Sequence, residues 1–197
     1  MRGIKRVNPF GIVGSLLAIA VFLLSVFYHH FWWEISVGDN VGHVGASALN
    51  YEIDLLGISM EVKILWFINL IFQMLLVESA IALMTYSVAP DRDFSEKLLK
   101  FSYLKPLSIL ISFVGFLLVL FVLLPSIVFH TVIPLSRSST ISISIMGLSV
   151  DIPIASSFTT YFWLMVVTTV FYIAAYTYHK KYILEPAEKE KAHSEEF

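Results

Sequence analysis

Four long apolar stretches dominate the pattern of hydrophobic and polar positions along the chain. They run approximately over residues 10–28, 64–88, 107–129 and 158–178. A hydrocarbon core about 30 Å thick is crossed by roughly 20 helical residues, and every backbone group within lipid needs a hydrogen-bond partner inside its own segment. The pattern therefore predicts four transmembrane helices.

Two shorter segments alternate strictly between apolar and polar residues. Residues 51–62 and 141–152 align without a gap, with Gly57 opposite Gly147 and Glu61 opposite Asp151. This alternation is typical of β-strands, and glycine at the second turn position can adopt the positive φ that a tight turn needs. We predict β-hairpins over 50–63 and 140–153, and their turns are Leu56-Gly57 and Met146-Gly147.

Pairing across these two turns matches apolar residues with apolar residues. The expected partners are Leu55–Ile58, Ile53–Met60 and Tyr51–Val62 in the first hairpin, and Ile145–Leu148, Ile143–Val150 and Ile141–Ile152 in the second. A slip of one residue would destroy this match. Pro153 suits a strand end or a sheet edge. We expect a cap of four strands whose apolar faces are buried against each other or against Trp32-Trp33.

The order helix, hairpin, helix occurs twice, which predicts an internal duplication with a pseudo-twofold axis along the membrane normal. The expected organisation is a first repeat over 1–90, a second over 91–181 and a charged tail over 182–197. Gly38, Gly42 and Gly45 are interpreted as a flexible connector. The layout resembles that of the claudin-type tetraspan proteins in shape, but the Trp and Cys signature of that family is absent.

Composition supports the membrane interpretation and narrows the chemistry. Hydrophobic residues make up 57% of the chain and charged residues 14%, which is too apolar for a water-soluble domain. The chain has no cysteine, which excludes disulfides and thiolate metal sites. The net charge of −2 gives no reason to expect nucleic acid as a partner.

Basic residues predict the orientation in the membrane. All but Lys63 and Arg137 precede the first apolar stretch, lie between the second and third, or follow the fourth. Cytoplasmic loops carry the excess of lysine and arginine. We therefore expect a plasma-membrane protein with both termini cytoplasmic and both hairpins outside.

Glu78 is the one ionisable residue within the four stretches. A carboxylate at that depth costs at least a few kcal/mol when it is ionised and unpaired, so it requires a partner or a function. Thr168, Tyr172 and Tyr176 form a hydroxyl stripe at helical spacing that could hydrogen-bond it, while Asn69 and Gln73 lie on another face. One hypothesis is a helix-to-helix clasp, and the other is a proton- or cation-handling site.

Histidines close the first and third apolar stretches. His29, His30 and His130, together with Glu34, could bind a metal ion or hydrogen-bond a quinone if the repeats bring them together. Histidine is also an ordinary capping residue at helix ends. The aromatic residues of 27–33, with Trp66 and Trp163, are interpreted as a membrane-interface belt. No cofactor is required by the sequence.

No nucleotide, hydrolase or metalloprotease motif is present in the chain. The leading hypothesis is a non-catalytic membrane subunit whose hairpins bind a protein partner or a second copy. The residues expected to carry that contact are Glu52, Asp54, Leu56, Gly57, Glu61, Met146, Gly147 and Asp151. A proton-coupled transporter or channel using Glu78, and a redox or metal subunit using the histidines, remain as alternatives.

Overall fold

The computed structural model describes residues 7–38, 41–90, 94–129, 133–145 and 148–184. Within these residues, four helical stretches are long and apolar enough to cross a membrane: Pro9–Val26, Lys63–Val88, Ser95–Ile127 and Thr160–Tyr182. They overlap the four stretches that the hydrophobic pattern predicts, but the third begins at Ser95 rather than near residue 107. Helix α1 is Pro9–Val26, α2 is Lys63–Val88 and α6 is Thr160–His179, which continues as a π-helical segment over Lys180–Leu184.

The third stretch is built from several pieces. A short amphipathic helix, α3 (Ser95–Ser102), lies where the sequence predicts only a loop, and α4 follows at Lys105–Leu117. The helix then widens into a π-helical segment, Leu118–Leu123, before α5 (Leu124–Phe129). None of the residues of this π-helical segment is buried. The helix starts at Lys105 because Pro106 suits a first helical position, where no amide donor is needed.

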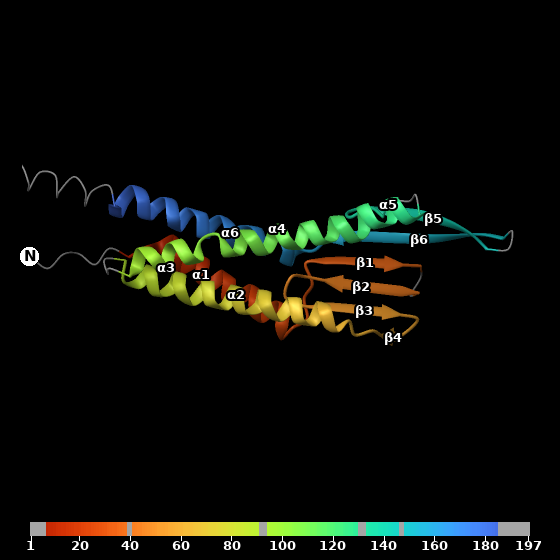
Figure 1. Cartoon of the computed structure of the whole chain (residues 1–197), viewed down its shortest axis with the longest axis horizontal. Helices are drawn as coiled ribbons and strands as arrows, with labels where there is room; N and C mark the ends of the chain where they lie inside the picture. Colours follow the sequence, from red (N-terminus) through yellow and green to blue (C-terminus); the bar gives the residue numbers. More distant parts are fainter. Residues whose placement is uncertain (1–6, 39–40, 91–93, 130–132, 146–147, 185–197) are drawn as a thin grey trace, which may run out of the picture. The chain divides into compact units, whose positions relative to one another are not determined.

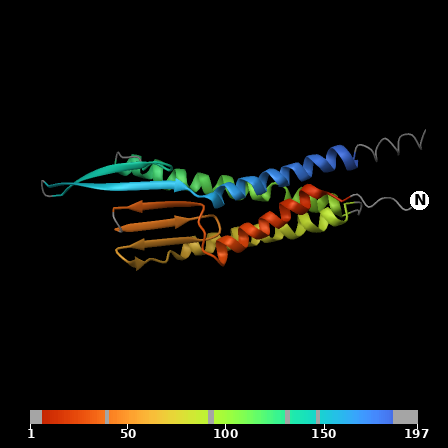
Figure 2. The same ribbon diagram turned by 180° about the vertical axis from the view of Figure 1, so that it is seen from behind.

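The chain also forms a six-stranded antiparallel sheet. Its strands are β1 (Trp33–Val37), β2 (Gly42–Ala46), β3 (Tyr51–Leu55), β4 (Ile58–Ser59), β5 (Ser138–Ile145) and β6 (Leu148–Phe158). The strand order is β4-β3-β2-β1-β6-β5, which can be followed from both sides in Figures 1 and 2. The register of the second predicted hairpin is the expected one, with Ile143 opposite Val150 and Ile141 opposite Ile152, and in the first hairpin Leu55 opposes Ile58 as expected. The expected strand pair Tyr51–Val62 does not form, because β4 ends at Ser59; the Tyr51 hydroxyl bonds the Val62 backbone instead.

The prediction of four strands was wrong. The segment with Gly38, Gly42 and Gly45 forms the β1–β2 hairpin rather than a connector. Glycine weakens the strand signal, but at position 45 it has a packing reason, because a Cβ there would lie 2.3 Å from the Phe31 ring. The first half of the chain thus contributes four strands and the second half two, so the sheet itself is not two-fold symmetric.

The expected burial of the two hairpins against each other is also not observed, because β1 and β2 separate them and place them at opposite edges. Pro153 lies inside β6 rather than at an edge. Its missing amide is harmless there, because Pro153 lies just beyond the last β1–β6 pair, Val37–Ile154. Trp32 and Trp33 are fully buried and belong to the core, whereas Trp66 and Trp163 are exposed as a belt requires.

The chain divides into two compact units. The helical unit comprises residues 1–22, 74–108 and 165–197, and the sheet unit comprises 23–73 and 109–164. In the helical unit, α1 approaches α2 and α6 closely through glycines, since a Cβ at Gly14 would lie within 3.4 Å of side chains from both helices. Buried residues of this unit include Leu76, Leu83, Tyr86, Met165 and Tyr172.

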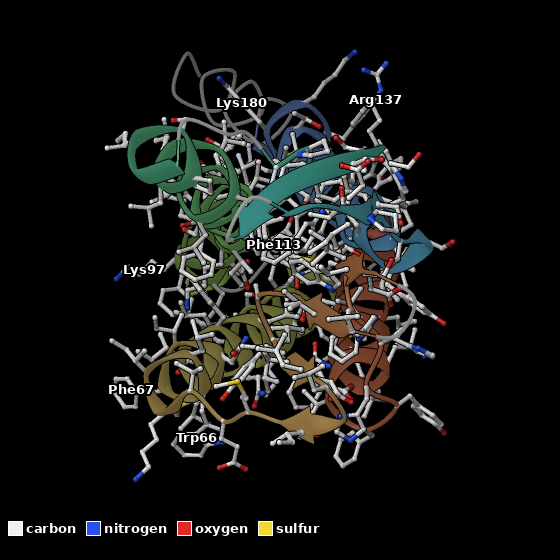
Figure 3. All side chains as sticks on the ribbon, turned by 90° about the vertical axis from the view of Figure 1, so that its right-hand side faces the viewer. Trp66, Phe67, Lys97, Phe113, Arg137 and Lys180 are labelled. Carbon is white, nitrogen blue, oxygen red and sulfur yellow. The ribbon has the colours of Figure 1, made fainter. Side chains whose placement is uncertain are left out.

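The sheet unit has its own core around the two tryptophans. The Trp32 ring packs edge-on against Phe113 of α4, with 5.3 Å between ring centroids, and the Trp33 ring lies 4.6 Å from that of Phe121. Figure 3 shows Phe113 among packed side chains, whereas Trp66 and Phe67 lie on the outside. The Trp33 indole Nε1 donates to the Leu135 carbonyl oxygen at 2.7 Å.

Candidate functional site

The sheet has one polar and one apolar face. Residues directly opposite in an antiparallel pair project to the same side, so the register assigns each residue to a face. The polar face carries Glu34, Ser36, His43, Glu52, Asp54, Ser59, Ser138 and Ser157, and the apolar face carries Trp33, Ile35, Val37, Val44, Tyr51, Ile53, Leu55, Ile58, Ile154 and Phe158. An apolar face of this size must be covered or must bind something.

Half of the apolar face is covered by the chain itself. Over β1 and β6, Trp33, Ile35 and Ile154 are at most 6% exposed. The segment that leads into β5 contributes to this cover, since the Ser156 hydroxyl donates to the Pro134 carbonyl and the Ser156 amide donates to the Arg137 carbonyl at 3.2 Å. This half of the face is a conventional core.

The other half is open over β4 and at the hairpin end of β3, whereas Tyr51 and Ile53 of β3 are half-buried. Ile58 is 68% exposed and Leu56, at the tip of the hairpin, is 76% exposed. Leu55 and Met60 extend this surface. We call it the exposed apolar patch, and it consists of Leu55, Leu56, Ile58 and Met60. Contiguous exposed apolar surface of this kind marks interaction sites on proteins.

The turn at the tip is strained. Leu56 has φ 54° and Gly57 has φ 76°, so both central residues are left-handed, as in a type I′ turn. Such turns favour Asn-Gly, and a leucine in this region costs roughly 1 kcal/mol because its Cβ crowds the following carbonyl. A large apolar residue is thus held at the most exposed point of the hairpin against its local preference.

A hollow of about 380 Å³ lies beside the patch, at the outer edge of β3. It lies where β4 has ended: β4 is only two residues long, and beyond it the Met60 amide donates to the Ile53 carbonyl at 2.8 Å. The Tyr51 hydroxyl fixes the departing chain by accepting from the Val62 amide at 2.8 Å and donating to the Val62 carbonyl at 2.9 Å. The hollow combines apolar and acidic groups: Tyr51, Glu52, Ile53, Ser59, Met60, Glu61, Lys63 and Trp66.

Among the described residues, the other hairpin residues predicted to contact a partner do not line this hollow. Asp54 lies on the polar face between His43 and Ser59, and its Oδ1 is buried without a hydrogen-bond partner among the described residues. Asp151 is exposed in β6, opposite Ser142 of β5. Met146 and Gly147 lie outside the described residues. The structure therefore places the acidic residues Glu52 and Glu61 at the hollow and Asp151 elsewhere on the sheet.

Glu78 has a partner that the sequence reasoning overlooked. The Lys105 ammonium, in the first turn of α4, lies 3.1 Å from Glu78 Oε2. The hydroxyl stripe of α6 is engaged separately: the Tyr172 hydroxyl lies 3.4 Å from Ser79 Oγ, and the Tyr176 ring stacks on Tyr103. Thr168 is buried. The hydrophobic pattern predicts Lys105 in a loop, because the apolar run begins two residues later, although Pro106 signals the helix start.

Asn69 and Gln73 hold the segment between β2 and β3. Their side-chain amides donate to the backbone carbonyls of Ser47 and Leu49, at 3.1 and 2.7 Å. The Asn50 side chain adds a third bond, to the Ser25 carbonyl at 2.7 Å. These amides therefore satisfy buried backbone carbonyls of a tight connection, which is a structural role.

The candidate histidine cluster is not assembled by the described residues. His29 is exposed, and its backbone has φ 52° at the end of α1. The His30 ring stacks on Tyr161, with 4.0 Å between ring centroids. Glu34 projects from the polar face of the sheet, and His130 lies outside the described residues. No group of three or more potential metal ligands occurs within the part of the chain that the structure describes.

The comparisons with known proteins add no relative. No family model matches this chain, and searches of curated proteins and of solved structures also found no match. The exposed apolar patch and its hollow are therefore interpreted from their own chemistry.

Proposed function

We propose that this chain is a non-catalytic, multi-pass membrane protein whose β-sheet forms a cap outside the plasma membrane and docks a protein partner through the exposed apolar patch. The proposal is carried by one observation: the apolar face of the sheet is covered over β1 and β6 but open over β4 and at the hairpin end of β3. Water-exposed apolar area costs about 25 cal/mol per Å², so the patch gains by being covered.

The strained turn supports the same interpretation. Leu56 is 76% exposed and left-handed, so neither packing nor backbone preference within the chain explains a leucine there. Strained residues that persist in a fold frequently belong to functional surfaces. Binding of a partner supplies the missing reason, because Leu56 would be buried in the complex.

The charge around the patch indicates the character of the partner. Glu52 and Glu61 line the adjoining hollow, and Lys63 is the one basic residue among its lining groups. The two segments proposed to lie outside the membrane, 29–62 and 130–159, carry six carboxylates and one arginine. Complementary charge steers association and excludes wrong partners. The partner expected here has an apolar contact surface bordered by lysine or arginine.

The proposed orientation follows from the distribution of basic residues. Eleven of the thirteen lie in the segments proposed to be cytoplasmic, together with both termini, which supports an outer position for the sheet. The four apolar helices would then be anchored in the lipid bilayer, with Trp66 and Trp163 at its surface. The Glu78–Lys105 ion pair supports a structural clasp between α2 and α4, so no transport site is proposed at Glu78.

Site-specific photo-crosslinking in native membranes tests the docking surface. A photoreactive residue at Ile58, on the apolar face, is expected to give a discrete protein adduct. The matched control is Ser59, its neighbour on the polar face, which should give none. Adding Leu56→Asn should reduce the Ile58 adduct several-fold while the hairpin remains folded. Equal labelling from both positions, or adducts to lipid alone from Ile58, would overturn the proposed docking of a protein.

A further inference from the structure

The β5–β6 hairpin extends beyond the rest of the sheet. β6 has eleven residues, but β1 pairs only with its last five, from Ile154 to Phe158. Figure 1 shows the hairpin reaching past the ends of β1, β2 and β3. Among the described residues, its distal part is a ribbon of two strands, and a two-stranded ribbon alone is marginal in water. The distal ribbon therefore needs a further partner.

Among the described residues β5 forms an edge of the sheet, and its sequence carries none of the usual features that prevent strand pairing. Natural edge strands are kept short, or carry charges, proline or bulges. β4, at the opposite edge, is only two residues long. β5 instead has eight residues, Ser138-Ser-Thr-Ile-Ser-Ile-Ser-Ile145, with no charge, no proline and no glycine. It is an open template for another strand.

The backbone groups that face this open edge can be assigned. The Gly38 amide donates to the Pro153 carbonyl at 2.7 Å, so Pro153 directs its backbone toward β1. Amide and carbonyl of one residue point to the same neighbouring strand in antiparallel pairing. Pro153 and its partner Thr140 therefore form a non-hydrogen-bonded pair, and Thr140 directs its own amide and carbonyl to the free edge. The same holds at every second residue: Ser138, Ser142 and Ser144.

The sequence at this edge is self-complementary. Ile141-Ser-Ile143-Ser-Ile145 reads the same in both directions. Antiparallel pairing of two such strands about Ile143 places isoleucine opposite isoleucine and serine opposite serine. The serines, whose amides and carbonyls face outward, would then carry the hydrogen bonds between the copies. Ile143 would meet Ile143 of the second copy at a non-hydrogen-bonded position, where facing side chains are closest.

We propose that β5 pairs antiparallel with β5 of a second copy of this chain, about a two-fold axis at Ile143. The two six-stranded sheets then become one continuous antiparallel sheet, and the distal ribbons gain the strands that they lack. A second copy is the occupant because the edge matches itself residue for residue. This contact uses the opposite edge from the exposed apolar patch, so it adds to the docking of a different protein.

Cysteine crosslinking tests the pairing directly, because the chain contains no cysteine of its own. In detergent, Ile143→Cys is expected to form a disulfide-linked dimer on oxidation. Ile141→Cys alone should not, because positions 141 of the two copies would be four residues apart along the strands, about 14 Å. A mixture of Ile141→Cys and Ile145→Cys should form the mixed dimer. Dimers of Ile141→Cys alone would show parallel pairing and overturn the proposal. The absence of dimers from both Ile143→Cys and the mixture would also overturn it.

Two substitutions at Ser142, to proline and to alanine, provide the matched control. Ser142→Pro removes an amide that faces the second copy and no amide that faces β6, so the dimer should be lost while the unfolding temperature is retained. Ser142→Ala keeps that amide and should keep the dimer, measured by light scattering in detergent. Ser142→Lys, which places charges at the shared edge, should also weaken the dimer. Undiminished dimers in both the proline and the lysine variants would overturn the pairing.

A patch variant separates this inference from the docking function. Leu56→Asn should leave the Ile143→Cys crosslinks in detergent unchanged, because it alters the exposed apolar patch and not β5. Loss of these crosslinks with Leu56→Asn would overturn the independence of the two contacts.

Discussion

Glu78 of α2 and Lys105 of α4 form an ion pair, with 3.1 Å between Oε2 and Nζ. The Lys105 ammonium also lies 3.4 Å from the centroid of the Phe101 ring, which adds a cation–π contact. Only 16% of the Lys105 side chain is exposed, against 54% for Glu78. The pair joins two helices that are distant in sequence, and in a membrane it would compensate the cost of a carboxylate among apolar residues.

Removing either charge should therefore destabilise the fold more than removing both. Lys105→Met leaves Glu78 without its cation, and Glu78→Gln leaves Lys105 without its anion. The double variant should recover part of the loss, with a coupling free energy of about 1 kcal/mol or more. The free energies of unfolding of the four proteins in detergent give this coupling. Additive effects of the two substitutions would contradict a stabilising pair.

The contrast between Glu78 and the helices shows what the sequence could and could not predict. Spans of this length and apolarity are determined by local composition, so four helices were predictable within a few residues. The partner of Glu78 depends on the tertiary position of a residue 27 places away, which no local pattern contains. The same distinction explains why hairpin registers were predictable, while burial of Trp32 and Trp33, which depends on Phe113 and Phe121, was not.

Asn8 caps α1 and holds three helices together. Its Oδ1 accepts from the Gly11 amide, while its Nδ2 lies 3.1 Å from the Tyr86 hydroxyl and 2.8 Å from the Ala175 carbonyl oxygen. Asn8→Ala should lower the free energy of unfolding by roughly 2–3 kcal/mol, because a helix cap and two buried hydrogen bonds between helices are lost. Thermal or denaturant unfolding in detergent measures the loss.

Serine at the same position separates the two roles of Asn8. Asn8→Ser keeps an oxygen that can cap the helix but cannot reach both other helices, so its cost should fall between those of asparagine and alanine. Equal stability of the serine and alanine variants would show that the cap contributes nothing. The signal was present in the sequence, because Asn followed by Pro is a strong helix start.

Two glycines in helices should respond to substitution in opposite ways. A Cβ at Gly11 would lie 2.0 Å from Ser87 Oγ, whereas a Cβ at Gly115 meets nothing within 4 Å. Gly11→Ala should therefore destabilise the protein by about 1–3 kcal/mol through overpacking between α1 and α2. Gly115→Ala should be neutral or stabilise by up to about 1 kcal/mol through helix propensity. Unfolding temperatures of the two variants compare them directly, and equal shifts would contradict the close α1–α2 contact.

His29 and His30 should also differ, although they are neighbours. His29 is left-handed, with φ 52°, and its side chain is exposed, while the amide of His30 donates to the Leu24 carbonyl at the end of α1. Glycine adopts this backbone freely, so His29→Gly should stabilise the protein by roughly 1 kcal/mol. His30→Gly should destabilise it instead, because the ring stack on Tyr161 is lost and the backbone gains freedom in the unfolded state. Both are measured as unfolding midpoints, with and without added zinc. Opposite signs identify His29 as a helix-terminating residue, whereas destabilisation by His29→Gly together with a zinc-dependent midpoint in the parent would revive the metal hypothesis for these histidines.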